Sequence, residues 1–283
     1  MTTNLRTPAV AGQFYEATGP ALKQEIEGCY LDRRGPGKLP EVDPAGPRRM
    51  LGLVAPHAGY IYSGPMAAHG YAALAADGRP EAFVIIGPNH GRGPWVSAIQ
   101  TSGAWRTPLG EAQVDAELAA ALASELPDFA TGPTAFSGEH SVEVQLPFLQ
   151  HLYGAGVKFV PLMMLDQDRD AAMAVGRALG RVLAGRDAVM IASTDMTHQQ
   201  PRQVATAQDE LLIERIAALD PEGLLAERAR GDITMCGYGP TAAMLIAAKQ
   251  LGATRTETFR YGDSGEAHPM GAVVGYLSLG VYR

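Results

Sequence analysis

The chain has 283 residues, of which 46% are hydrophobic and 19% are charged, and its formal net charge is -7. These values are typical of a globular protein with one large domain or two small ones. The acidic balance argues against nucleic-acid binding, which depends on clustered Lys and Arg. The chain has only two cysteines, no apolar leader and no apolar run of roughly 20 residues, so we expect a soluble, cytoplasmic protein without a membrane partner.

Residues 32–49 crowd proline, glycine and charged residues together near the start of the chain. Only about 30 residues precede this segment, which is too few to form a core alone. We therefore expect a long surface loop rather than a domain boundary, and a single domain over residues 1–283.

From residue 50 onward, short apolar runs alternate with Ala- and Leu-rich stretches of helical spacing. The expected strands are 50–55, 82–87, 157–165, 188–193 and 271–282, and the expected helices are 65–76, 114–126, 142–153, 169–184 and 240–251. Pro147 predicts a kink or a late start in the third of these helices. The alternation predicts an α/β fold with a mostly parallel sheet covered by helices on both faces.

Polar side chains follow three of the expected strands. His57 comes after the first strand in "APHAGY", His90 after the second in "GPNHG", and Asp195 and His198 after the fourth in "STDMTH". Ligands of open parallel sheets bind beyond the carboxyl ends of the strands, so we expect these side chains to converge there. Taken singly, each histidine could be a loop residue whose ring is hydrogen-bonded to backbone carbonyls, and Asp195 could cap a helix. The appearance of such residues after several strands instead favours a functional site.

Two further segments contribute candidate residues. Glu139 and His140 stand in "SGEHSVEVQ" just before an expected helix. The alternative to a functional role is that both are solvent-exposed residues at the start of this helix. Cys236 stands in "MCGYGP" ahead of a helix expected to begin at Pro240, whose positive end would favour the thiolate. A buried, inert cysteine is the alternative for Cys236, and it is our expectation for Cys29. We expect His69 and His151 to be structural.

Several common chemistries lack their motifs in this sequence. There is no P-loop, no G-x-G-x-x-G after the first strand, no G-x-S-x-G and no H-E-x-x-H. Two imidazoles with one carboxylate suit non-haem iron(II), whereas a thiolate from Cys236 makes copper(I) or zinc competitive. His198, farther from such an ion, suits a general acid or base. A zinc metallohydrolase is a third reading.

Seven motifs, in this order along nearly the whole chain, resemble the Memo family, known in prokaryotes as component B of the AmmeMemoRadiSam system. They are "TPAVAGQFY", "APHAGYIYSG", "GPNHG", "WRTPLGE", "EHSVEVQLPFLQ", "STDMTH" and "MCGYGP". The resemblance implies a fold similar to the class III extradiol dioxygenases, with a metal crevice in one α/β domain. The family's metal positions match His57, His90 and Cys236, its neighbouring acid and histidine match Asp195 and His198, and its "EHS" segment matches Glu139 and His140.

The resemblance also implies iron or copper binding, oxidation-reduction, and association with an AMMECR-type protein and a radical SAM enzyme. Our leading interpretation is an extradiol-dioxygenase-like oxidoreductase of unknown substrate that binds iron(II), with copper or zinc as alternatives. His198 and Asp195 would move substrate protons. A cysteine at the third metal-ligand position, Cys236, differs from the dioxygenases, whose third ligand is typically a carboxylate or histidine. The alternative is therefore a metal-binding redox or scaffold protein that turns over no small molecule.

Overall fold

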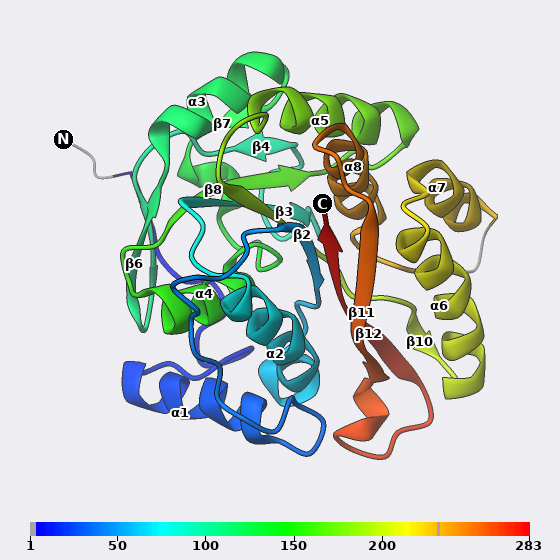
Figure 1. Ribbon diagram of the computed structural model, residues 1–283. Helices are drawn as coiled ribbons and strands as arrows, with labels where there is room; N and C mark the ends of the chain where they lie inside the picture. The colour runs from blue at the N-terminus through cyan, green and yellow to red at the C-terminus, as the bar shows by residue number, and fades with distance from the viewer. Residues whose placement is uncertain (1–3, 231–232) are drawn as a thin grey trace.

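The computed structural model describes residues 4–230 and 233–283 (Figure 1). Its strands are β1 (Leu5–Arg6), β2 (Met50–Ala55), β3 (Ala82–Pro88), β4 (Ala98–Ile99), β5 (Ala104–Thr107), β6 (Gly110–Val114), β7 (Ala130–Thr131), β8 (Lys158–Met164), β9 (Ala188–Ser193), β10 (His198–Gln200), β11 (Arg255–Asp263) and β12 (Val273–Tyr282). Its α-helices are α1 (Gly19–Leu31), α2 (Tyr60–Ala76), α3 (Ala116–Glu125), α4 (Leu146–Tyr153), α5 (Arg169–Val182), α6 (Arg202–Ala217), α7 (Pro221–Ala229) and α8 (Tyr238–Gln250).

One mixed sheet runs through the molecule in the order β1-β5-β6-β8-β3-β9-β2-β12-β10, with β11 paired to β12. Its centre, from β6 through β8, β3 and β9 to β2, is parallel. Strand β12 is antiparallel to β2, β10 and β11. The predicted mostly parallel sheet is confirmed, and all five expected strands are present.

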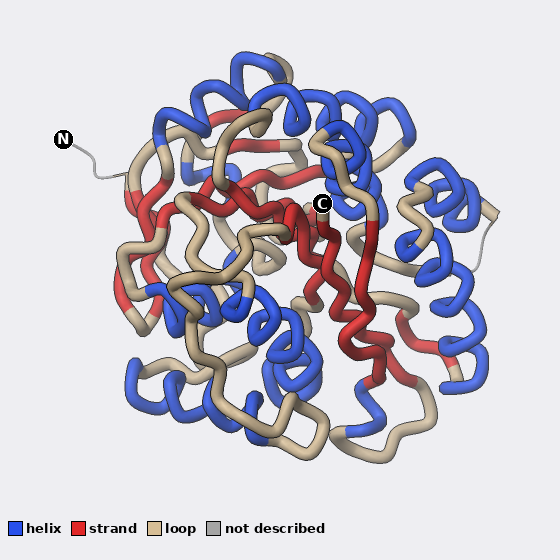
Figure 2. Tube along the Cα trace, in the orientation of Figure 1, coloured by secondary structure: helices blue, strands red, loops and turns tan. Residues whose placement is uncertain are grey.

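Helices cover both faces of this sheet, as predicted. In Figure 1, α3, α5 and α8 lie on one side of the strands and α1, α2 and α4 lie on the other. The tube in Figure 2 shows the strands enclosed between these two groups of helices. Every residue of β2 and β3 is buried, because a parallel strand between two helical layers has no solvent-facing side. Helices α6 and α7 pack beside α8 and the antiparallel end of the sheet.

The prolines in two helices are accommodated in different ways. Helix α2 begins at Tyr60, earlier than expected, although Pro65 lies inside it. Pro65 cannot donate to the carbonyl of Ile61, and the guanidinium of Arg34 donates to that oxygen instead at 3.3 Å. Pro147 lies in the first turn of α4, after a short 3₁₀ turn. The predicted late helix start at this proline is confirmed.

The long segment at 32–49 contains no helix or strand before β2. Its end is anchored by Arg48, whose guanidinium pairs with Asp77 at 3.0 Å and with Asp187. Within the described residues, no helix combines the length and the apolar character needed to cross a membrane.

Candidate metal centre

The candidate site lies beyond the carboxyl ends of β2, β9 and β3, which are neighbours in that order. His57 follows β2, Asp195 follows β9 and His90 follows β3. The strands that precede the two histidines are two strand spacings apart, roughly 10 Å. The imidazoles lean toward each other across this gap, and their ring centroids are 5.2 Å apart. Cys236 joins them, so that three ligand atoms from His57, His90 and Cys236 lie within 4.8 Å of one another.

His90 is held by the carboxylate of Glu139. Its Nδ1 lies 2.9 Å from Glu139 Oε1, and its backbone N–H donates to Glu139 Oε2 at 2.6 Å. Because an ionised carboxylate only accepts, the proton of His90 is on Nδ1 and the lone pair of Nε2 is left for a ligand. Glu139 therefore orients His90 in the way that carboxylates orient metal-binding histidines.

Glu139 is ionised in spite of its burial. Desolvation alone would raise its pKa, but the hydrogen bonds that Glu139 accepts from the side chain and the backbone of His90 outweigh this effect and hold the pKa well below its usual value. The backbone N–H groups of His140 and Ser141 also donate to Oε1, at 2.7 and 2.8 Å. Because its carboxylate already accepts these hydrogen bonds and its pKa is low, Glu139 is poorly suited to accept a substrate proton.

Cys236 lies close to both His57 and Asp195. Its Sγ is 3.2 Å from His57 Nε2 and accepts the backbone N–H of Asp195 at 3.1 Å. Burial, followed by the charge of Asp195, raises the pKa of the Cys236 thiol well above its ordinary value. Burial and the charge of Asp195 therefore oppose the thiolate that we expect the start of α8 to favour. A bound cation would have to displace this proton.

His140 packs against both candidate histidine ligands. Its ring stacks on His90 with centroids 4.7 Å apart and meets His57 edge-on at 5.4 Å. Its Nδ1 is 3.3 Å from Glu139 Oε1 but forms no hydrogen bond within the described part of the chain. Burial lowers the pKa of His140 to about 3, so this imidazole is neutral at pH 7.

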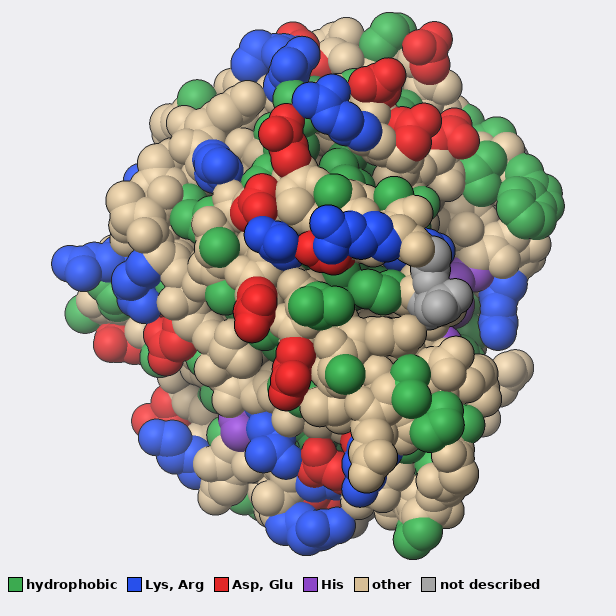
Figure 3. Space-filling model, turned by 90° about the vertical axis from the view of Figure 1, so that its right-hand side faces the viewer, with side chains coloured by type: hydrophobic (Ala, Val, Ile, Leu, Met, Phe, Trp, Pro, Cys, Tyr) green, Lys and Arg blue, Asp and Glu red, His purple; other side chains and the backbone are tan. Residues whose placement is uncertain are grey.

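Asp195 and His198 border the centre without joining the ligand group. Asp195 Oδ1 accepts the backbone N–H groups of His57 and Ala58, at 2.8 and 3.3 Å, and so fixes the loop after β2. His198 Nδ1 donates to the carbonyl of Thr234 at 3.0 Å, which leaves Nε2 unprotonated in the neutral ring. Histidine side chains are visible in a recess near the right-hand edge of the face in Figure 3.

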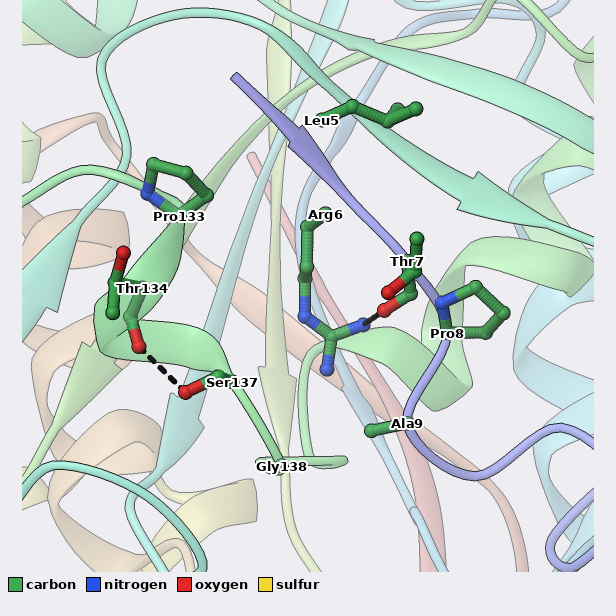
Figure 4. Close-up of a pocket in the computed structure, with 9 residues that line it drawn as sticks. All are labelled: Leu5, Arg6, Thr7, Pro8, Ala9, Pro133, Thr134, Ser137 and Gly138. Carbon is green, nitrogen blue, oxygen red and sulfur yellow. Dashed lines mark hydrogen bonds between the residues drawn. The ribbon is translucent and has the colours of Figure 1, made fainter. Parts of the chain in front are cut away.

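The N-terminal segment packs against the loop that carries Glu139. The sequence alone did not indicate this contact. Arg6 is 4% exposed, and its guanidinium donates to the carbonyls of Phe136 and Glu139, at 3.2 and 2.5 Å, and to the carboxylate of Glu143 at 2.5 Å. Figure 4 shows Arg6 on β1 beside a cavity of about 530 Å³ that Ser137 and Gly138 of the facing loop also line, with its guanidinium bonded to the carbonyl oxygen of Thr7. Glu143, four residues after Glu139 in the sequence, belongs to this contact and not to the metal-ligand group.

Two other histidines, His69 and His151, and the second cysteine, Cys29, lie elsewhere. His69 Nε2 is 2.9 Å from the carbonyl oxygen of Arg34, and His151 is 3.7 Å from Glu27. Cys29 is buried between α1 and α2, and burial raises the pKa of its thiol. None of these three side chains belongs to a potential metal-ligand group among the described residues.

Comparison with known proteins places the chain in a protein family. A family model described as Memo-like protein matches residues 6–280. The chain belongs to the Memo-like family. A MEMO1 family protein of Methanopyrus kandleri is 48% identical over 98% of this chain and 99% of that protein, and one of Methanothermobacter thermautotrophicus is 46% identical over 97% and 99%. The predicted family membership is thereby confirmed.

A solved structure supports the fold. The crystal structure of an uncharacterized protein from Escherichia coli K12 matches with a TM-score of 0.56, covering 82% of this Memo-like chain and 100% of that chain. The two sequences are 19% identical, so this likeness concerns the architecture alone.

The donor set fits a first-row transition-metal ion. Two ligands that each lie about 2.0–2.3 Å from one ion are roughly 3–4 Å apart, and His57 Nε2 and Cys236 Sγ are 3.2 Å apart. His90 and His57 approach from two strands, and Cys236 approaches from the segment before α8. Two imidazoles and a thiol also match the ligand preferences of iron, copper and zinc.

Proposed function

We propose that this Memo-like protein binds one metal ion through His57, His90 and Cys236. The observation that carries the proposal is the convergence of three ligand atoms within 4.8 Å at the carboxyl edge of a parallel sheet. Glu139 supports it by holding His90 through Nδ1. Iron(II) is the first choice because three ligands on one side leave open positions for other molecules, and copper or zinc follow because the third ligand is sulfur.

The reaction that we propose is an oxidation of a still unidentified small molecule, of the extradiol-dioxygenase type. When bound, the ion would supply Lewis-acid and one-electron chemistry at its open positions. His198 bonds the carbonyl of Thr234 through Nδ1, so its Nε2 is the nitrogen that would accept or return a substrate proton. Asp195 would keep the loop of His57 in place, and the neutral ring of His140 would hold the two histidine ligands through its packing against both.

The second candidate is a metal-binding redox or scaffold protein of the cytoplasm that turns over no small molecule. The thiol of Cys236 at the third position favours it, because thiolates hold copper and zinc in sites that need no substrate. Its partners would be an AMMECR-type protein and a radical SAM enzyme, as the family resemblance implies.

Metal analysis tests the site itself. We expect about one equivalent of iron in protein purified anaerobically, and loss of that metal in His57→Ala and His90→Ala, because each removes one of three ligands. His69→Ala is the matched control, since His69 bonds a backbone carbonyl elsewhere in the fold. Full metal content in both ligand variants would refute the assignment.

Oxygen uptake separates the two candidates. Iron-loaded protein is measured with and without a panel of catechols. Uptake that a substrate stimulates, and that His198→Ala abolishes, supports the oxidoreductase. If no compound in the panel stimulates uptake while metal is bound, the redox or scaffold protein is favoured.

A further inference from the structure

A buried hydrogen-bond chain reaches His57 from the side opposite the candidate metal centre. His57 is 1% exposed, and its Nδ1 lies 2.9 Å from the hydroxyl of Ser193, which is fully buried. Ser193 is the last residue of β9, and it pairs with Ala55 at the end of the neighbouring strand β2. The sheet therefore places this hydroxyl directly beneath the loop that carries His57.

The proton on Ser193 can be located from its partners. A serine hydroxyl has one hydrogen to donate. Ser193 Oγ is 2.6 Å from the carbonyl oxygen of Ser141, which can only accept, so the hydrogen points there. The Ser193 hydroxyl must then accept a hydrogen bond from His57 Nδ1. The proton of the neutral imidazole is therefore on Nδ1.

The hydrogen bonds of the Gln145 amide lead to the same position for the Ser193 proton. Its Nε2 lies 2.8 Å from Ser193 Oγ and 2.9 Å from the carbonyl oxygen of Pro56, and its Oε1 accepts the hydroxyl of Tyr71 at 2.6 Å. Turning the amide round would set Oε1 against the Pro56 carbonyl, two acceptors without a proton between them. Gln145 is therefore a donor to Ser193, and Ser193 keeps its own proton for Ser141.

We propose that Ser193 and Gln145 are positioning residues that hold the proton of His57 on Nδ1 and so keep the lone pair of Nε2 aimed at the metal centre. Without the Ser193 hydroxyl, Nδ1 loses its acceptor. The neutral ring is then free to carry its proton on Nε2, which faces the sulfur of Cys236 at 3.2 Å. A metal ion would have to displace that proton before binding.

The same hydroxyl links the supports of the two histidine ligands. Ser141, which accepts from Ser193, donates its backbone N–H to Glu139, and Glu139 holds His90. The Ser141 hydroxyl donates to the carbonyl of Pro88, at the end of β3. Ser193 thus bridges the end of β9, the loop of Glu139 and the ring of His57, and its loss should loosen all three.

The first test needs no metal. In chelator-treated protein labelled with ¹⁵N-histidine, two-bond proton–nitrogen spectra distinguish the protonated from the bare imidazole nitrogen. We expect His57 to be protonated on Nδ1 in the wild type, and this population to fall in Ser193→Ala. A wild-type His57 protonated on Nε2 would overturn the inference, whatever the protein does with metals.

The second test is a cobalt(II) titration of the same proteins, which rests on the proposed metal function. We expect Ser193→Ala to bind cobalt(II) about 10- to 100-fold more weakly, while the sulfur-to-cobalt absorption band persists at saturation because all three ligands remain. Gln145→Leu should weaken binding in the same direction. Ser278→Ala is the matched control, because Ser278 is fully buried and its hydroxyl has no partner in the described residues.

The outcomes keep the two proposals apart. If the wild type binds no cobalt(II), the proposed metal function fails, and the proton position of His57 still decides the role of Ser193. If the wild type binds and Ser193→Ala binds equally well, the positioning role fails while the metal site stands. Should Ser193→Ala not fold, Gln145→Leu and the wild-type spectrum carry the test.

Discussion

Replacing Glu143 with alanine should destabilise the fold more than any surface substitution. Its carboxylate is fully buried and accepts the guanidinium of Arg6 and the hydroxyl of Tyr15, both at 2.5 Å, and the backbone N–H groups of Ala9 and Val10, at 2.8 and 3.1 Å. Removing one partner of a buried ion pair costs about 3–5 kcal/mol. The three other donors would also lose an acceptor, at about 1–3 kcal/mol for each that water cannot reach. We therefore expect a loss of at least about 4 kcal/mol in the free energy of unfolding.

Urea unfolding followed by fluorescence is a suitable assay, because the ring of the buried Trp105 lies 4.1 Å from the Arg6 guanidinium carbon. Glu111→Ala is the control: Glu111 forms an exposed pair with Arg106, which should contribute no more than about 1 kcal/mol. If Glu143→Ala stays within about 1 kcal/mol of the wild type, the buried pair is not the support that we infer.

A double variant distinguishes the ion pair from the wider contact. Replacing Arg6 with methionine and Glu143 with leucine removes both charges, and such swaps are often neutral when the pair stands alone. Here we expect no recovery, because the N–H groups of Ala9 and Val10 and the hydroxyl of Tyr15 still lack an acceptor. Full recovery would show that the charges alone decide the stability.

Two further changes probe the region under His198. Burial raises the pKa of Asp209 above its unfolded value, despite hydrogen bonds from Thr197 and Tyr261. The folded state therefore binds the proton first, so the stability of the wild type relative to Asp209→Asn should rise as the pH falls through the raised pKa of the folded state, by up to about 1.4 kcal/mol per pH unit. It should level off below the unfolded pKa, and urea titrations at several pH values that give a flat difference would contradict this. Gly275→Ala would place a Cβ 1.9 Å from Asp209 Oδ2. We expect a loss of about 3 kcal/mol in urea unfolding, whereas Gly271→Ala, which meets nothing within 4 Å, should be neutral; equal stability of the two variants would contradict the clash.

The centre of the fold could be predicted because its strands are continuous apolar runs, which only a fully covered parallel sheet requires. The hairpin β5–β6 was missed because its residues are mixed in character and partly exposed. Helix α6 was missed although its buried positions, Ala205, Asp209, Leu212 and Ile216, follow helical spacing. One of those four is an aspartate, and its burial depends on donors supplied by other elements.

The candidate site was predictable to the extent that strand ends determine it. The rule for parallel sheets located His57, His90 and Asp195, because each follows a buried strand directly. The roles of Ser193 and Arg6 depend on partners far away in sequence, so no local pattern marks them. The environment of Cys236 is a related case, because the helix start that favours its thiolate is visible in the sequence, whereas the burial that raises the pKa of its thiol is not.

The order of the strands also governs when the two histidines can meet. Strands β2 and β3 come early in the chain, yet they do not pair with each other, because β9 lies between them. Until residues 188–193 are in place, nothing in the sheet fixes the distance between the segments of His57 and His90. Folding must therefore close loops longer than 100 residues, such as the one between the paired Gly52 and Met190, which slows folding in general. A nascent chain still lacking β9 would carry both imidazoles on separate, unconnected strands, so the centre forms only after most of the protein has been synthesised.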